Sequence, residues 1–240
     1  MRPNYTLPRL HLDVPLSGDI ALSRDHAHYL GTVLRKREGD SVRLFNARDG
    51  EWAADVVSAA KRAMTVRVTE RLRDPHTVPD IRLLFAPLRK HRTATVFEKA
   101  TELGVRTLQP VITERTQFPK LNLERARAQI VEAAEQTERL DLPELRAPVP
   151  LMDALEDRSL VFADEAGDAS GALAALKTLQ PPLDILIGPE GGFTTAEREA
   201  IRARADTTAV TLGPRILRAD TAAISLLTLV QARCGDWRQM

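Results

Sequence analysis

Residues 187–195 read "IGPEGGFTT", and the apolar run "PLDILIG" at 182–188 leads into them. A short continuous apolar run of this kind predicts a buried strand. Thr194 and Glu197 then form a capping-box pattern, which predicts that a helix begins after the loop. Ligands of open parallel sheets bind beyond the carboxyl ends of strands, where loops run into helix N-termini. The stretch therefore predicts an α/β fold with a ligand loop. The alternative is a loop that only turns the chain, with Glu190 in solvent.

A second stretch repeats the arrangement. Residues 208–227 read "TAVTLGPRILRADTAAISLL", so that an expected strand ends at Gly213 and a helix is expected to begin near Asp220 or Thr221. Two strand ends thus carry Gly-Pro loops. Their small residues favour contact between a ligand and the main chain, since glycine lets the backbone approach closely. Neither loop contains the G-x-G-x-x-G or G-x-x-x-x-G-K-[ST] pattern, so a dinucleotide fingerprint and a P-loop are not supported.

The rhythm of the chain changes near residues 73–80, where "RDPHTVPD" predicts a linker. Residues 1–73 alternate polar and apolar residues in short runs around one helix that begins at Ser23, and Asp49-Gly50 predicts a hairpin. Residues 80–240 alternate apolar runs with amphipathic segments. We therefore expect a small β-rich domain at 1–73 and an α/β domain with a mostly parallel sheet at 80–240. Its expected strands are "IRLLFAPL", "TLQPVI", "LVFAD", "LDILIG" and "TAVTLG".

The amino-acid composition is typical of a folded globular protein. The 240 residues include 43% hydrophobic residues, carry a net charge of +1 and contain one cysteine, Cys234. A single cysteine excludes an intramolecular disulfide and a cysteine-rich zinc site. The chain shows neither a long apolar span nor an apolar leader at "MRPNYTLPRLHL", so we expect a cytoplasmic protein.

Basic clusters suggest contacts with phosphates. Arg35, Lys36 and Arg37 are consecutive, and Arg89 and Lys90 directly follow an expected strand. An ordinary solvated surface explains the same clusters equally well. His26 and His28 form a pair without an evident third ligand, so we expect a helix surface there and no metal site.

Four ordered motifs resemble the RsmE family of SPOUT-class methyltransferases, and the resemblance spans the whole chain. The motifs are "IGPEGGFT", "LGPRILRADTAA", "EKATELGV" at 98–105 and "EAAEQTER" at 132–139. This family methylates N3 of one uridine in 16S ribosomal RNA of the small subunit with S-adenosylmethionine. The start of the chain, with "LPRLHL" and "HYLGTVLRKREGD", is similar to the family's PUA-like RNA-binding domain.

The resemblance implies a trefoil knot in the C-terminal domain, a homodimer, and cofactor sites near the subunit interface. Periodicity cannot reveal a knot, which is a rare exception to the usual topology rules. Carried onto this chain, the cofactor loops are 188–192 and 212–217, and the strand end "VFADE" at 161–165 is a third wall. The implied cofactor-binding residues are Phe162, Gly188, Gly191, Gly192, Leu212, Gly213, Ile216 and Leu217, and the implied RNA-binding residues are Arg9, Arg35, Lys36, Arg37, Arg89, Lys90 and Arg115.

The reaction that the resemblance implies suggests two catalytic residues. Uridine N3 must lose its proton before it attacks the methyl group, and a cation near the uracil carbonyls would stabilise the resulting anion. Arg218 is the candidate for that role, against a salt bridge to Asp220 or to a partner subunit. Glu190 is the candidate proton acceptor, against a hydrogen bond to loop amides.

The chain departs from the family at Ala219-Asp220, where the family usually reads Thr-Glu. The departure leaves the role of Asp220 open between helix capping and chemistry. Three other functions stay open at this point. They are a related enzyme that methylates a ribose or another base, a non-catalytic RNA-binding assembly factor, and an unrelated phosphate-binding α/β enzyme.

Overall fold

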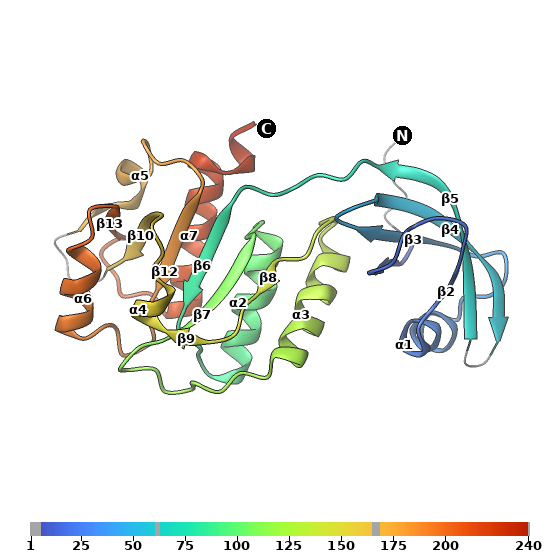
Figure 1. Cartoon of the computed structure of the whole chain (residues 1–240), viewed down its shortest axis with the longest axis horizontal. Coiled ribbons are helices and arrows are strands. Elements are labelled where there is room, and N and C mark those ends of the chain that lie inside the picture. Colours follow the sequence, from blue (N-terminus) through green and yellow to red (C-terminus); the bar gives the residue numbers. More distant parts are fainter. Residues whose placement is uncertain (1–5, 61–62, 165–168, 240) are drawn as a thin grey trace. The chain divides into compact units, whose positions relative to one another are not determined.

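The computed structural model describes residues 6–60, 63–164 and 169–239. The chain divides into two compact units, of which the first comprises Met1–Thr77 with Ala134–Asp141 and the second comprises Val78–Ala133 with Leu142–Met240 (Figure 1). The first unit therefore contains a segment from far along the chain in addition to the β-rich region. Among the described residues, no helix combines the length and the apolar character needed to cross a membrane.

The first unit is built on a five-stranded sheet with the order β1-β3-β4-β5-β2. β1 pairs with β3 in parallel, and the other pairs are antiparallel. One face packs on an apolar core that includes Leu30, Val42, Leu44 and Val66. The elements are β1 (Arg9–His11), β2 (Asp19–Ala21), α1 (Arg24–His28), the π-helix η1 (Tyr29–Val33), β3 (Ser41–Asn46), β4 (Gly50–Ala60) and β5 (Ala63–Arg73).

The local signals of this region act as the sequence predicts, with one difference. Gly50 has φ of +80° at the hairpin between β3 and β4, and the Ser23 side chain accepts a hydrogen bond from the His26 amide as a helix N-cap. The expected single helix is instead one short α-helix followed by a π-helical turn. Leu30 is buried in that turn, whereas Val33 is 59% exposed, so the apolar pattern there is only partly used for the core.

A buried carboxylate, Glu51, organises the basic residues of the first unit. Its side chain is fully buried and receives Arg9 Nε at 2.5 Å and Arg73 Nε at 2.7 Å, with Arg43 Nη1 at 3.4 Å. Glu138, from the segment 134–141, receives both terminal nitrogens of Arg43 at 2.8 Å. Burial by itself raises the pKa of Glu51, but the hydrogen bonds from Arg73 and Arg9 hold that pKa below its ordinary value. These arginines are therefore structural ion-pair partners.

The second unit contains an eight-stranded sheet with the order β11-β13-β10-β12-β6-β7-β8, and β9 also pairs with β7. Every strand pair described in it is parallel. The strands are β6 (Ile81–Phe85), β7 (Thr107–Ile112), β8 (Glu144–Leu145), β9 (Val149–Pro150), β10 (Ser159–Ala163), β11 (Ser170–Gly171), β12 (Leu183–Ile187) and β13 (Thr207–Thr211). The helices are α2 (Lys90–Glu102), α3 (Leu123–Gln136), α4 (Leu151–Ala154), α5 (Ala172–Ala175), α6 (Thr195–Arg202), α7 (Ala219–Cys234) and the 3-10 helix η2 (Asp236–Gln239).

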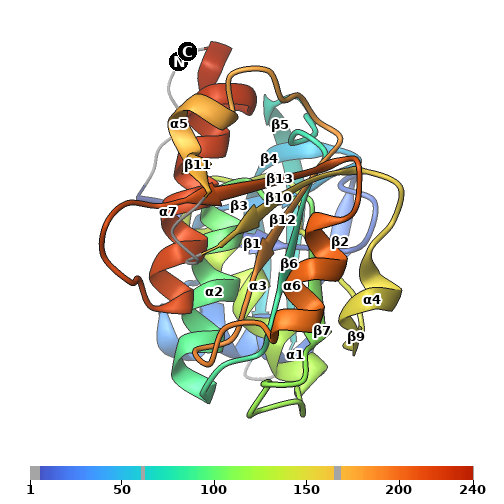
Figure 2. The same ribbon diagram turned by 90° about the vertical axis from the view of Figure 1, so that its left-hand side faces the viewer.

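Helices cover both faces of this sheet, as Figure 2 shows. Leu83, Phe85 and Ile185 belong to a core with residues of α2, α3 and α7. The alternate residues Leu84 and Leu186 belong to a second core with residues of α4 and α6. Because neighbouring residues of a strand point to opposite faces, continuous apolar runs are what a sheet buried on both sides requires.

A buried ion pair joins the central strands. In the register of β6 and β12, Arg82 lies opposite Asp184, and Arg82 Nε donates to Asp184 Oδ1 at 2.9 Å. Arg158, just before β10, donates from Nε to the same oxygen at 2.8 Å. The carboxylate is 2% exposed. Asp184 therefore links three neighbouring strands near their amino-terminal ends.

We predict that Glu51→Gln destabilises the protein by about 3 kcal/mol, because it leaves buried guanidinium groups without their carboxylate. The depressed folded-state pKa of Glu51 means that this ion pair stabilises the fold above the unfolded-state pKa and loses its effect as pH falls through the lower folded-state pKa. Urea unfolding of both proteins at pH 7 and at successively lower pH will measure their free energies of unfolding. The difference between wild type and variant should shrink at acid pH.

The control for this prediction is Asp19→Asn. Asp19 forms an exposed ion pair with Arg67 at 2.6 Å, and exposed pairs contribute little. An effect of Glu51→Gln no larger than that of Asp19→Asn would contradict the structural role of Glu51.

Candidate active site

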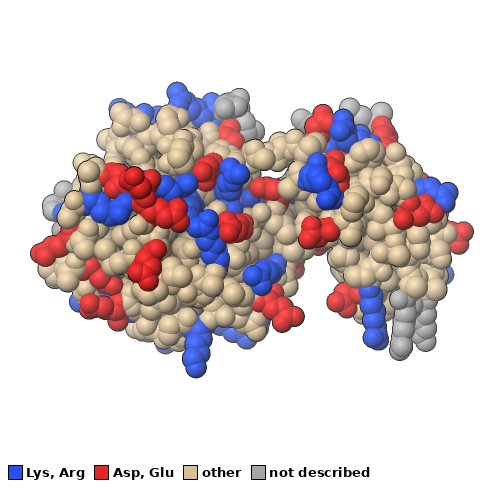
Figure 3. Space-filling view, viewed as in Figure 1, with Lys and Arg blue, Asp and Glu red and all other residues tan. Residues whose placement is uncertain are grey.

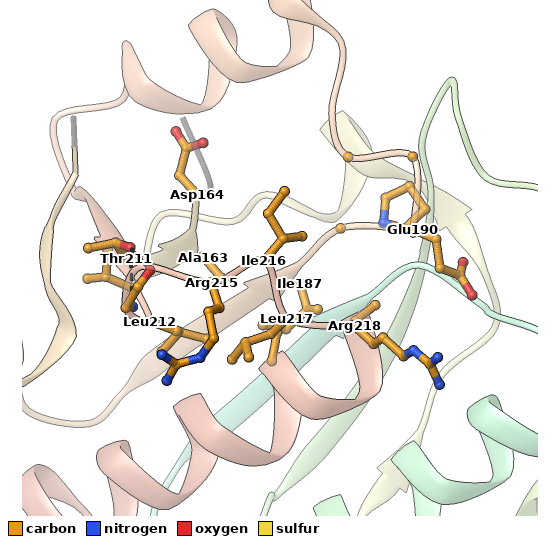
Figure 4. A pocket seen from close by; sticks show the side chains of 18 of the residues that line it. Ala163, Asp164, Ile187, Glu190, Thr211, Leu212, Arg215, Ile216, Leu217 and Arg218 are labelled. Carbon is orange, nitrogen blue, oxygen red and sulfur yellow. Dashed lines mark hydrogen bonds between the residues drawn. The ribbon is translucent and has the colours of Figure 1, made fainter. Parts of the chain in front are cut away.

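A cavity of about 780 Å³ lies at the carboxyl ends of β10, β12 and β13 (Figure 4). The lining includes Ala163, the last residue of β10, and Asp164, which follows it. The loops after β12 and β13 supply most of the remaining lining. The size is in the range of roughly 300–1,000 Å³ typical of small-molecule and cofactor sites. The predicted residues that line it are Gly188, Glu190, Gly191, Gly192, Leu212, Gly213, Ile216, Leu217 and Arg218.

The first loop is shaped by glycine at two points. A Cβ on Gly188 would lie 2.6 Å from Cε2 of Phe193, so a side chain does not fit there without movement. Gly192 has φ of +65° and its amide donates to the Pro189 carbonyl at 2.9 Å, which closes a tight turn. Phe193 is buried and meets Phe162 edge-on, with ring centroids 5.1 Å apart.

The structure corrects the expectation that Phe162 binds the cofactor directly. Its side chain is fully buried and is not among the residues that line the cavity. Side chains alternate between the two faces of a strand, and the side chain of Phe162 lies on the face of β10 that packs against α6. Phe162 supports the loop through Phe193.

Two contacts hold the same loop to the segment after β7. Arg115 Nη1 donates to the Gly191 carbonyl at 2.8 Å, and the Glu114 amide donates to Glu197 Oε1 at 2.9 Å. Glu197 also completes the predicted capping box with Thr194 at the start of α6. The guanidinium of Arg115, expected to contact RNA, is thus engaged with the cavity loop.

The second loop presents apolar and basic side chains to the cavity. Gly213 has φ of +115°, a conformation that disfavours other residues. Ile216 is 89% exposed, which is unusual for a large apolar side chain at the mouth of a cavity. Arg215 and Arg218 extend from this loop in different directions (Figure 4). Arg218 is the N-cap residue of α7, so the helix begins slightly earlier than the sequence suggested.

Asp164 is a lining residue that sequence reasoning did not single out, although "VFADE" was identified as a wall. Its fully buried carboxylate receives Arg198 Nε at 3.1 Å and Arg202 Nη2 at 2.7 Å, both from α6. The next residue of that motif, Glu165, lies outside the described residues. Asp164 is neutralised by two arginines, and thus anchors α6 beside the cavity.

The structure separates the alternatives for the charged candidates. Asp220 Oδ1 lies 3.5 Å from Nη1 of Arg92 in α2, and it also accepts a hydrogen bond from the Thr221 amide. Among the described residues, no salt bridge involves Arg218, and no hydrogen bond joins the Glu190 carboxylate to the loop amides. Both side chains are exposed. They remain available to a ligand in the cavity.

The residues expected to bind RNA fall into different environments. Arg9 is 5% exposed, and besides Glu51 it donates to the carbonyls of Ala134 and Arg139 and stacks 4.0 Å above the Phe45 ring. The expectation for Arg9 is therefore wrong, because its donors are used inside the first unit. Exposed or half-buried side chains are found at Arg35, Lys36, Arg37, Arg89 and Lys90.

Charge alone does not mark a binding face. On the face shown in Figure 3, basic and acidic side chains are interspersed over the surface. Within the described part of the chain, no group of three or more His, Cys, Asp or Glu residues is arranged to hold a metal ion.

Comparison with known proteins finds two family models. A model described as "RNA methyltransferase domain" matches residues 75–231, and one described as "RNA methyltransferase PUA domain" matches residues 22–69. Among curated relatives, ribosomal RNA small subunit methyltransferase E of Rickettsia conorii is 35% identical over 88% of this chain and 89% of its own length. The protein of the same name from Synechocystis is 32% identical over 90% of this chain and 74% of its own length.

Solved structures agree with these matches. A putative methyltransferase of Legionella pneumophila in complex with bound SAM gives a TM-score of 0.84 at 32% identity, over 96% of this chain and 99% of that one. Ribosomal RNA small subunit methyltransferase E of Neisseria gonorrhoeae, bound to S-adenosyl methionine, gives 0.82 at 25% identity, with the same shares covered.

We predict that Gly188→Ala lowers both stability and affinity for S-adenosylmethionine. The added methyl group forces the buried Phe193 ring or the loop to move, and such overpacking costs about 1–3 kcal/mol. The matched control is Gly171→Ala, where a Cβ meets nothing within 4 Å. Calorimetric titration and thermal unfolding will compare the two variants. Wild-type affinity for S-adenosylmethionine in Gly188→Ala would contradict the prediction that the cofactor binds at this loop.

Proposed function

This chain belongs to the ribosomal RNA small subunit methyltransferase E family, and we propose that it transfers a methyl group from S-adenosylmethionine to N3 of one uridine in 16S ribosomal RNA. The observation that carries the proposal is the cavity between the two Gly-Pro loops, at the carboxyl ends of parallel strands. Relatives named ribosomal RNA small subunit methyltransferase E match across nearly the whole chain, which supports methylation of small-subunit ribosomal RNA here.

The residues around the cavity suit S-adenosylmethionine. The loop 188–192 lines the cavity with three glycines, so it offers a ligand mostly main chain there. Leu212, Ile216 and Leu217 supply apolar surface, and a ligand that covers Ile216 would remove its exposed side chain from water. We propose that these two loops hold the adenosine and methionine parts of the cofactor.

Bound S-adenosylmethionine supplies an electrophilic methyl group on a sulfonium. The protein must provide a uridine that is aligned and has lost its N3 proton. Arg218 places a permanent cation at the rim of the cavity, where it stabilises negative charge on the uracil carbonyls. Glu190 places a carboxylate on the opposite loop, where it accepts the proton or orients the base.

The ion pair between Asp220 and Arg92 gives the departure from the family pattern a structural role. Asp220 lies in the first turn of α7, where the helix dipole stabilises a carboxylate. Its ion pair with Arg92 joins α7 to α2. We therefore propose that Asp220 stabilises the packing of α7 on α2. Arg218 is then not paired with Asp220, and its positive charge can act on the substrate.

The first unit is proposed to bind RNA, since the PUA model matches residues 22–69. Arg35, Lys36 and Arg37 are its proposed contacts, and Arg89 and Lys90 are those of the second unit. We propose a cytoplasmic location, which fits ribosomal RNA as the substrate. The trefoil knot stays a prediction from the family resemblance.

We propose a homodimer that uses α7. This helix is apolar on more than its buried side, and its exposed or half-buried residues include Thr221, Ile224, Ser225, Thr228 and Ala232. Small and apolar residues on an outer helix face are suited to close packing against a second copy.

Sedimentation velocity should give a dimer for the wild type and a smaller species for Ile224→Arg, because a buried interface does not accommodate an unpaired charge. Wild-type protein that sediments as a monomer at micromolar concentration would rule out the stable dimer.

Small ribosomal subunits that lack the modification should accept labelled methyl from S-adenosylmethionine, and mass spectrometry of the digested RNA should show 3-methyluridine. A different methylated nucleoside would change the proposed specificity. Cofactor binding without transfer to any subunit RNA would favour an assembly factor.

In the same assay, Arg218→Ala should reduce turnover by about a hundredfold or more, because an electrostatic donor to the transition state is lost. The fold should be unchanged, since Arg218 is exposed. Arg233→Ala, at the exposed end of the same helix, is the control. Near-normal turnover by Arg218→Ala would remove this residue from the mechanism.

A further inference from the structure

A second, smaller pocket of about 250 Å³ lies beyond the carboxyl ends of β6 and β7. Its walls come from the segment after β6, the first turns of α2 and α3, and the segment leading into α3. The interior is apolar at Leu88, Ala94 and Phe97. The volume is about a third of that of the cofactor cavity, so the pocket has room for only one small group.

The rim of this pocket is basic. Lys90, Lys120 and Arg125 line it, and none of the described residues that line it is acidic. Lys90 also lies in the first turn of α2, which contains no acidic residue; of its neighbours there, Arg92 is paired with Asp220 of α7. Cations at a helix N-terminus oppose the helix dipole and slightly destabilise the folded chain. This placement is explained if the rim meets an anion.

Phe118 gives the pocket an aromatic wall that water still reaches. The side chain is 36% exposed although it lines the pocket. The amide side chains of Asn122 and Gln129 also line it; Asn122 Oδ1 accepts from the Arg125 amide, so the Asn122 NH2 group and the Gln129 amide are the groups that can hydrogen-bond a polar edge. An aromatic wall, amide groups and surrounding cations are the combination that recognises unpaired nucleotides, because bases stack on aromatic rings and phosphates pair with cations.

The pocket and the cofactor cavity lie along one edge of the sheet. β12 pairs in parallel with β6, and β6 pairs in parallel with β7. Adjacent strands are about 4.8 Å apart, so a short RNA segment can reach both sites. The segment after β7 joins them: Arg115 holds the Gly191 carbonyl of the cofactor loop, and Phe118 and Lys120 line the second pocket.

We propose that the second pocket is a subsite for an unpaired nucleotide of the substrate RNA, near the uridine that is methylated. The base stacks on Phe118, and its phosphates pair with Lys90, Lys120 and Arg125. This inference rests on the proposed function, because it takes RNA as the substrate. It adds a site of recognition that the cofactor loops do not provide.

The test is the affinity for a short fluorescein-labelled single-stranded RNA that contains all four bases, measured by anisotropy. Phe118→Ala should weaken binding by roughly tenfold, the usual effect of losing base stacking, and Phe118→Trp should keep it. Arg125→Gln should weaken binding and reduce the dependence of log affinity on log salt by about one. Arg127→Gln is the matched control, because Arg127 is also exposed on α3 but does not line the pocket.

Affinity for S-adenosylmethionine and the thermal midpoint should not change in these variants, because Phe118 and Arg125 are exposed and lie outside the cofactor cavity. With small subunits as substrate, KM should rise while kcat is kept.

Wild-type RNA affinity in both Phe118→Ala and Arg125→Gln would overturn the proposal. Conversion of a dimer to a monomer by Phe118→Ala would also overturn it, since a second copy of the chain would then cover the pocket. The anisotropy measurement needs no methyl transfer, so failure of the wild type to methylate subunits would count against the proposed function and not against the subsite.

Discussion

The larger unit depends on the buried ion pair between Arg82 of β6 and Asp184 of β12. Both side chains are almost fully buried, at 3% and 2% exposure, and they face each other in the register of the two strands. A shift of one residue would move each charge to the other face and leave it unpaired in an apolar core. Arg158 extends the same constraint to β10. The pair therefore fixes three strands at one end of the sheet, and the opposite ends of two of them, β10 and β12, border the proposed cofactor cavity.

The glycine-rich loop after β12 presents mostly main chain to the cavity and is held in place by contacts from outside it. Phe193 fills the space beneath Gly188, Arg115 holds the Gly191 carbonyl, and Glu197 joins the start of α6 to the segment after β7. These contacts hold the loop in one conformation, and none of them is made by a side chain of the second loop. Preorganisation lowers the entropy that binding must overcome, so a glycine-rich loop can still bind a cofactor selectively.

The sequence predicted the parts of the fold that depend on local pattern, and it predicted less well those that depend on distant contacts. Continuous apolar runs located the five main strands, and Thr194 with Glu197 located the start of α6, because each signal lies within a few residues. Arg9 was misassigned since its partners, Glu51 and the carbonyls near residue 134, are far away along the chain. Phe162 was misassigned because the sequence does not show which face of β10 meets the cavity.

Burial decides which arginines of a nearly neutral chain are available to RNA. Several are used inside the fold: Arg9, Arg43 and Arg73 share Glu51 and Glu138, and Arg198 with Arg202 neutralises Asp164. The net charge of +1 therefore does not show which cations the surface can offer, because the fold uses five of these arginines with only three carboxylates. What matters is a cation that forms no ion pair with any described residue and lies beside a surface that suits the other half of the ligand. Arg218 meets this condition beside the cofactor cavity, as Lys120 and Arg125 do beside Phe118, and both places lie on the edge that the parallel strands define.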